Sequence, residues 1–145
     1  MAEIATYVAG ALAELASGST WLWILIGTFM GIIVGAIPGF TSSMATGILL
    51  PVTFALSPVN ALVFLISVYI ATIYGGSITA ILLNTPGAPE SSASTFDGYK
   101  MTLKGQGCEA LGIAFCSSAC GGLISYIFMI FAMMPIARMA VKIGP

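Results

Sequence analysis

The apolar positions of this chain are gathered into long runs, which prolines, glycines and one polar stretch separate. The first run covers residues 20–37 and carries no charged side chain. Later runs cover residues 48–83 and 109–135, the last beginning at a glutamate. A membrane-spanning helix needs about 20 mostly apolar residues. The pattern therefore predicts an all-α integral membrane protein, a bundle of transmembrane helices that forms a single domain over residues 1–145.

Two interruptions fall inside the apolar region of residues 20–83. Pro38-Gly39 ends the first run, and Gly75-Gly76 precedes an apolar stretch about four times too short to cross a bilayer. Backbone that is broken at membrane depth is tolerated only where protein buries it or where it lines a watery cavity. We therefore expect broken or re-entrant helices, with breaks at 38–39 and 75–76. The residues alone also allow one long kinked helix through 74–76.

The N-terminal residues show a different pattern. Six apolar residues recur at helical spacing over residues 4–15, which indicates an amphipathic helix lying at the membrane surface over residues 1–19. Trp21 and Trp23 then mark where the chain enters the bilayer, because indole rings prefer the interface.

Residues 84–106 are the only long polar stretch, and we expect a loop there. A transmembrane span is predicted over residues 109–135. If this span crosses once, Arg138 and Lys142 lie on the opposite side from Lys100 and Lys104, which conflicts with the positive-inside rule. Either Gly121-Gly122 turns the span into a hairpin, or these four charges are too few to set the topology; we favour the second explanation.

Four glycines recur every fourth residue along the first run. In a helix this spacing leaves a groove without side chains, in which another helix can approach closely. Tight helix packing is the plainer interpretation, and a sliding or gating surface is the alternative. The glycines are Gly27, Gly31, Gly35 and Gly39.

The composition argues against nucleic-acid binding and against an enzyme. The 145 residues are 59% hydrophobic and 6% charged, with a net charge of −1, so no basic surface exists for nucleic acid. There is no histidine, no carboxylate pair and no cysteine beside a base, so we expect no enzyme and no resident cofactor. Cys116 and Cys120 share a helix face; we interpret them as packing residues rather than a metal or redox pair.

The two breaks gather the groups that a transport site needs. Helix N-termini, free N–H groups and hydroxyls attract anions, whereas carbonyl and hydroxyl oxygens suit a sodium ion. The hydroxyls that follow Pro38-Gly39, on Thr41, Ser42, Ser43 and Thr46, are N-cap candidates for a new helix. The alternative for these hydroxyls is that they bond back to their own helix. We expect substrate and ion binding at two groups of residues, namely Pro38, Gly39, Thr41, Ser42 and Ser43, and Gly75, Gly76, Ser77, Asn84, Thr85 and Gly87.

These same residues carry a family resemblance. The runs GTFMGIIVGAIPGFTSSMATGILLPVTFALSP and YGGSITAILLNTPGAPESSASTFDGYKMTLKGQG closely resemble the large membrane subunit of the tripartite tricarboxylate transporters. The resemblance implies a multi-pass permease of the bacterial inner membrane that takes up carboxylates such as citrate together with a cation, for which sodium is the candidate. It also implies two partners, a small membrane subunit and a periplasmic solute-binding protein. Because that large subunit is several times longer, we expect this chain to be its N-terminal part.

A membrane scaffold that transports nothing is the alternative. In such a protein the glycines would serve only to assemble helices, and the polar stretch would dock another protein. A passive pore is less well supported, because no ring of charges lines any span.

Overall fold

The computed structural model describes residues 10, 15 and 17–143, so the expected surface helix over residues 1–19 lies almost wholly outside the described part. Within that part the fold is helical and contains no strand, as the sequence predicts. Three helices, α2, α4 and α6, are long and apolar enough to cross a membrane. The elements are α2 (Gly18–Gly35), α3 (Ser42–Leu49), the 3-10 helix η1 (Leu50–Ala55), α4 (Pro58–Leu83), the 3-10 helix η2 (Pro89–Ser91), α5 (Ala93–Leu103) and α6 (Gly107–Ile143).

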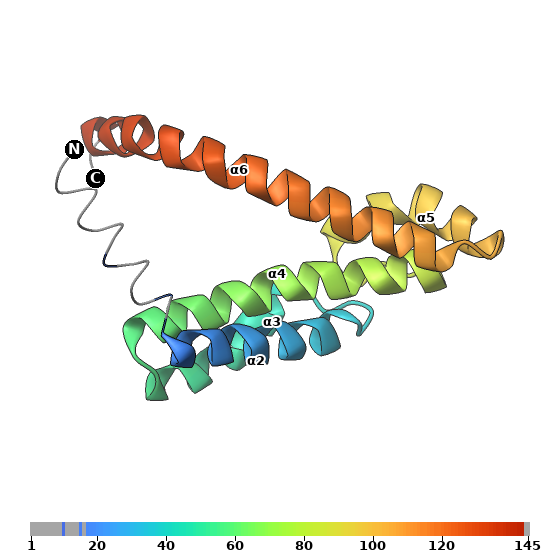
Figure 1. Ribbon diagram of the computed structural model, residues 1–145, viewed down its shortest axis with the longest axis horizontal. Helices are drawn as coiled ribbons and strands as arrows, with labels where there is room; N and C mark the ends of the chain where they lie inside the picture. The colour runs from blue at the N-terminus through green and yellow to red at the C-terminus, as the bar shows by residue number, and fades with distance from the viewer. Residues whose placement is uncertain (1–9, 11–14, 16, 144–145) are drawn as a thin grey trace.

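Helices α2 and α4 run parallel and in close contact (Figure 1). Three glycines of α2 lie directly on the backbone of α4, because a Cβ atom on any of them would collide with a carbonyl oxygen there. This is the close packing that small residues permit in membranes. The pairs are Gly27 with Phe64, Gly31 with Val68, and Gly35 with Thr72. Gly39, the fourth glycine of the repeat, has nothing within 4 Å of its added Cβ and so takes no part in this packing.

The chain leaves the helix between α2 and α3, as expected at Pro38-Gly39. Proline disfavours helix at the residue before it, and Gly39 has a φ of 87°, which few other residues adopt. Since α2 and α4 are parallel, α3 and η1 together carry the chain back across the structure (Figure 1). Ala45 and Leu49 of α3 pack in a buried cluster with Phe64 and Val68 of α4.

The expected break at 75–76 is wrong, because α4 is one uninterrupted helix from Pro58 to Leu83. A glycine in a helix costs about 1 kcal/mol relative to alanine but leaves its hydrogen bonds in place. The glycine pair instead allows close approach: a Cβ on Gly75 would lie 2.6 Å from the Ile32 carbonyl oxygen of α2. The helix ends at Asn84, which has the left-handed φ of 57°.

The polar stretch 84–106 is not simply a loop, which corrects a second expectation. It folds back along α4, forms η2 and then the eleven-residue helix α5. Ala88 is 2% exposed and Ser91 is 1% exposed, so the returning segment is buried at these residues. Helix α5 is held against the end of α4 by the Thr102 hydroxyl, which donates to the Ile81 carbonyl oxygen at 2.8 Å. Side-chain packing and these hydrogen bonds therefore order a segment whose composition is typical of a loop.

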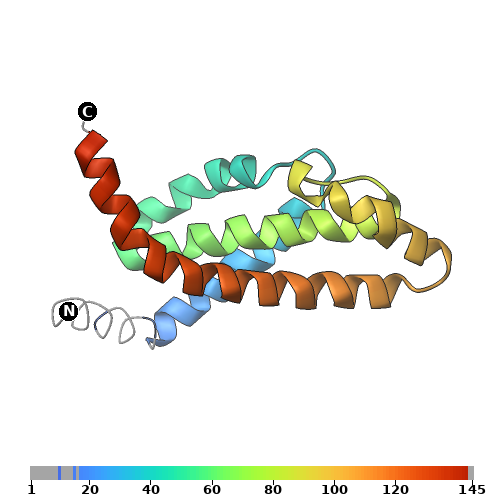
Figure 2. The same ribbon diagram turned by 90° about the horizontal axis from the view of Figure 1, so that it is seen from above.

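Helix α6 is continuous through Gly121-Gly122, so the hairpin interpretation is wrong. It contains Pro135, and Figure 2 shows the helix bending toward its C-terminal end, as expected where proline removes a backbone hydrogen bond. Near its start α6 meets α4 through Tyr74 and Phe115, whose rings stack edge to face at 5.6 Å. Beyond this contact α6 diverges from α2 and α4 (Figure 1).

Candidate functional site

The end of α2 lies against the middle of α4, which is the longer of the two helices. The register is set at the start of the two helices, where the Thr20 hydroxyl donates to the Asn60 side-chain oxygen at 3.0 Å. It brings Gly35, the last residue of α2, against Thr72. At about 1.5 Å per residue, Thr72 lies roughly 16 Å from the C-terminal end of α4, within a hydrocarbon core about 30 Å thick. A hydrocarbon core centred on α4 would therefore contain the break between α2 and α3.

The start of α3 presents a capped helix N-terminus at this break. Thr41 is the N-cap, and its hydroxyl oxygen accepts the backbone N–H of Met44 at 3.2 Å. The first N–H groups of a helix have no acceptor within it, and they carry a partial positive charge. The N–H groups of Ser42 and Ser43 belong to this first turn, so the break offers donors to an anion.

Ser42 adds a hydroxyl that the fold leaves unused. The side chain is 1% exposed, and its Oγ atom has no hydrogen-bond partner among the described residues. A buried polar group without a partner costs about 1–3 kcal/mol, so such a group calls for a ligand or a water. Ser43 next to it is exposed. Ser42 is therefore the predicted site residue whose environment most favours a bound group.

Three glycines from separate segments meet beside this break. Gly87, in the segment returning from α4, donates its N–H to the Gly76 carbonyl oxygen at 3.5 Å. A Cβ on Gly87 would lie 2.5 Å from the Gly35 carbonyl oxygen and 2.8 Å from the Gly76 Cα atom. The end of α2, the middle of the second half of α4 and the returning segment are thus in backbone contact. We call Gly35, Gly76 and Gly87 the glycine junction.

Two serines hold the returning segment against α4. The Ser91 hydroxyl donates to the Ile73 carbonyl oxygen at 3.1 Å. The Ser77 hydroxyl lies 3.2 Å from the same oxygen and 3.3 Å from the Ser91 Oγ atom. The alternative expectation, that hydroxyls after Pro38 bond back to their own helix, describes Thr46, whose hydroxyl donates to the Ser42 carbonyl oxygen at 2.7 Å. Ser77 does the same in α4. Its hydroxyl supports the junction rather than standing free for a ligand.

The structure divides the predicted site residues into three sets. One set lies at or beside the glycine junction, a second lies exposed in the turns on either side, and the third, which is Thr41, Ser42 and Ser43, lies at the start of α3. Gly75, Gly76, Ser77 and Gly87 belong to the first set. Pro38, Gly39, Asn84 and Thr85 are exposed, and among the described residues no hydrogen bond joins the segment 38–43 to the segment 84–87.

Sequence reasoning missed three residues that build the junction. Gly35 supplies the carbonyl oxygen against Gly87, and Ser91 fixes the returning segment. The Thr79 hydroxyl donates to the Gly76 carbonyl oxygen at 3.1 Å. Gly35 was visible in the four-residue glycine repeat and Ser91 lay in the polar stretch 84–106, but nothing in the sequence indicates that they meet at Gly76.

Around the break and the glycine junction, the polar groups are uncharged backbone amides, carbonyls and hydroxyls. Residues 18–89 contain no Asp, Glu, Lys or Arg. Among the described residues no group of three or more His, Cys, Asp or Glu side chains could hold a metal ion. An anion would therefore be bound by N–H and O–H groups at the start of α3, and a cation by the carbonyl oxygens that end α2.

Comparison with known proteins relates the chain to one family and to a protein of similar sequence. The model of the tripartite tricarboxylate transporter TctA family matches residues 21–145. A protein of Agrobacterium vitis, described as an uncharacterized 52.8 kDa protein in the TAR-I ttuC' 3' region, is 38% identical over 123 residues. That match covers 85% of this chain and 24% of the relative, so the chain spans about a quarter of the relative's length. No solved structure matches the chain.

Proposed function

Because the chain belongs to the tripartite tricarboxylate transporter TctA family, we propose that it is a permease component for the uptake of tricarboxylates or related carboxylates. The proposal places it in the bacterial inner membrane as a multi-pass secondary transporter, and a symported cation, with sodium as the candidate, drives the uptake. A small membrane subunit and a periplasmic solute-binding protein are the proposed partners. The family and the three span-length helices support a membrane transport role.

The observation that carries the proposal is the broken helix beside Thr72. Discontinuous membrane helices place N-terminal dipole ends toward anionic substrates and unwound carbonyls toward coupling ions. Here α2 ends and α3 begins within a hydrocarbon core that is centred on α4, and Ser42 places in the first turn of α3 a buried hydroxyl that has no partner among the described residues. A carboxylate at this place would gain the N–H groups of Ser42 and Ser43.

The glycine junction supports the same proposal from the other side of the break. It holds the returning segment against the end of α2, with Gly87 in contact with Gly35. In the segment between α2 and α3, the Ile37 carbonyl oxygen accepts the Phe40 N–H and the Thr41 carbonyl oxygen accepts the Ala45 N–H. The carbonyl oxygens of residues 38–40 are therefore the candidate ligands for sodium. The donors at the start of α3 and the acceptors in the segment before it therefore lie at one break, with the glycine junction beside it.

The test uses two neighbouring serines of α3. In membrane vesicles that carry the complete three-component system, Ser42→Ala should lower citrate uptake at least tenfold, because it removes the buried hydroxyl. Ser43→Ala should change it less than twofold, since Ser43 is exposed. Each variant is assayed with and without a sodium gradient. Equal uptake rates in Ser42→Ala and the unsubstituted protein would contradict the proposed site. An uptake rate that is the same with and without the sodium gradient would contradict the proposed coupling.

A further inference from the structure

Most of α6 has no neighbour within the described part of the chain. Its first half packs on α4 and α5, where Ala110 is 5% exposed. Beyond residue 110 no described side chain of α6 is buried, although residues 107–133 have a mean hydropathy of 1.9 over their most apolar window. Tyr126 is 53% exposed, and Met129 is 59% exposed. The second half of α6 is thus an apolar surface that its own chain does not cover.

A groove opens where α6 diverges from α4. It has a volume of about 470 Å³, and a second hollow of about 280 Å³ adjoins it through the shared residues Ile70, Tyr74 and Phe115. The second hollow reaches Thr28 and Ser67, at the seam between α2 and α4. The remaining residues of the groove are Ser118, Ala119, Gly122, Leu123 and Tyr126.

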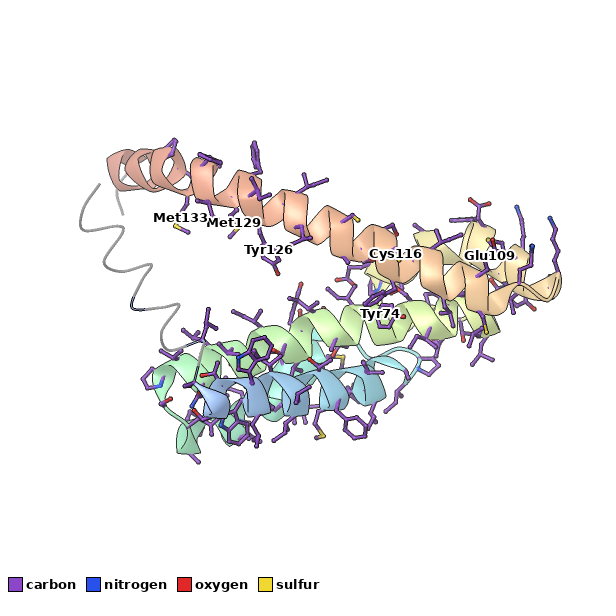
Figure 3. All side chains as sticks on the ribbon, viewed as in Figure 1. Tyr74, Glu109, Cys116, Tyr126, Met129 and Met133 are labelled. Atoms are coloured by element: carbon purple, nitrogen blue, oxygen red, sulfur yellow. The ribbon has the colours of Figure 1, made fainter. Side chains whose placement is uncertain are left out.

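The face of α6 along this groove has the periodicity of a helix-packing seam. Six residues follow one another at alternating intervals of four and three positions, which is the heptad spacing of helices that wrap around each other. Figure 3 shows that Tyr126, Met129 and Met133 point from α6 toward the side of α2 and α4. The seam consists of Phe115, Ala119, Gly122, Tyr126, Met129 and Met133.

The groove continues an interface that already exists. Ala110, Ala114, Ser118 and Gly122 recur every fourth residue of α6. Ala110 and Ala114 line a hollow shared with Ile81 of α4, so they lie at the packed end of the stripe. Ser118 and Gly122 carry the same stripe into the open groove. Small residues at this spacing allow helix backbones to approach, whereas a lipid chain gains little from them.

We propose that this groove is a docking site for one uncharged transmembrane helix, supplied by permease sequence of the kind found in the part of the Agrobacterium vitis relative that this chain does not match. The relative is about four times longer than its match to this chain. The incoming helix comes from this unmatched sequence. The incoming helix packs along the heptad seam, with its side chains against Gly122 and between the rings of Tyr74 and Tyr126.

Photocrosslinking identifies the occupant directly. The chain is co-expressed in bacterial membranes with the unmatched part of the relative, and p-benzoylphenylalanine replaces Tyr126 or, as the matched control, Phe128. Phe128 is also aromatic and exposed, at 73%, but lies about 200° further around the helix. We expect an adduct with the relative's segment at position 126 in at least fivefold higher yield than at 128. Adducts with a second copy of this chain, adducts with lipid alone, or equal yields at both positions would overturn the proposal.

A pair of leucine variants gives an independent measure. Gly122→Leu fills the groove and should lower co-purification of the relative's segment at least tenfold in mild detergent. Ser117→Leu adds the same side chain on the opposite face of α6 and should lower it less than twofold. Equal losses in the two variants, or no co-purification with the unsubstituted chain, would count against the docking site. Neither readout depends on carboxylate transport, so this proposal can fail while the proposed function stands.

Discussion

Gly35 and Gly87 are in backbone contact, although 51 residues and the whole of α4 separate them in the sequence. A Cβ on Gly87 would lie 2.5 Å from the Gly35 carbonyl oxygen. Through this contact the returning segment packs against both the end of α2 and the backbone of α4. The following predictions test the packing, the hydrogen bonds and the function that depend on it.

The first prediction concerns Gly87. Gly87→Ala places a methyl group against the backbone of both Gly35 and Gly76, which cannot move as a flexible side chain could. The returning segment should therefore lift from α4, and amide hydrogen exchange in residues 84–91 should become at least tenfold faster. Gly112→Ala is the control, since nothing lies within 4 Å of its added Cβ. Unchanged exchange in Gly87→Ala would contradict the junction.

The second prediction concerns the contact between α2 and α4. In Gly31→Ala the new methyl group would lie 2.6 Å from the Val68 carbonyl oxygen. Overpacking of this kind costs about 1–3 kcal/mol, so the free energy of unfolding measured by titration with sodium dodecyl sulfate should fall by that amount. Gly47→Ala in α3 meets open space. It should leave stability unchanged or raise it by up to about 1 kcal/mol, because alanine favours helix.

The third prediction concerns Ser91. Ser91→Ala removes the hydroxyl that donates to the Ile73 carbonyl oxygen and lies within hydrogen-bond distance of Ser77. The expected loss is about 1 kcal/mol in the free energy of unfolding, together with faster proteolysis of residues 84–106. Ser94→Ala, at a half-buried position on α5, provides the matched control. If both alanine variants behave alike, the Ser91 hydrogen bond does not hold the segment.

The fourth prediction concerns the cap of α3. Thr41→Ala removes the oxygen that accepts the Met44 N–H, and loss of such a cap costs about 0.5–2 kcal/mol. Thr41→Ser keeps the oxygen and should recover most of that loss. Both variants are compared by unfolding in detergent. A serine variant as unstable as the alanine variant would show that the methyl group of Thr41 matters more than its hydroxyl.

The fifth prediction separates a permease from a scaffold. A protein in which Thr41 and Ser42 are both alanine should lose citrate uptake at least tenfold if the start of α3 serves a binding site, because the cap and the buried hydroxyl are removed. Its co-purification with the small membrane subunit should fall less than twofold, because the glycine contacts between α2 and α4 remain. Uptake at the unsubstituted rate would favour the scaffold, as would joint loss of uptake and assembly.

Local chemistry made several features predictable. Pro38 removes a backbone donor and restricts the residue before it, so the end of α2 could be placed without knowledge of its neighbours. A hydroxyl after such a break favours an N-cap, and Thr41 has that role. The apolar runs predicted helices of membrane-spanning length because a bilayer leaves the backbone few other ways to satisfy its hydrogen bonds.

Gly75 and Gly76 show where local reasoning fails. Glycine permits a break but does not require one, and its effect depends on what approaches it. In this protein Ile32 of α2 packs on Gly75, and Ala88 and Ser91 pack on Gly76, so the pair stays helical. The folding of residues 84–106 into η2 and α5 likewise depends on contacts with α4, which is outside that segment.

The sequence by itself therefore predicted an apolar, helical membrane protein, the break after α2 and the cap of α3. Each of these follows from composition or from interactions within a few residues. Only the tertiary structure decided that α2 and α4 run parallel, that Gly35, Gly76 and Gly87 meet, and that the buried Ser42 hydroxyl has no hydrogen-bond partner within the described part of the chain. Those features arise from contacts between residues far apart in the chain, and no local pattern encodes which distant surface a glycine or a hydroxyl will face.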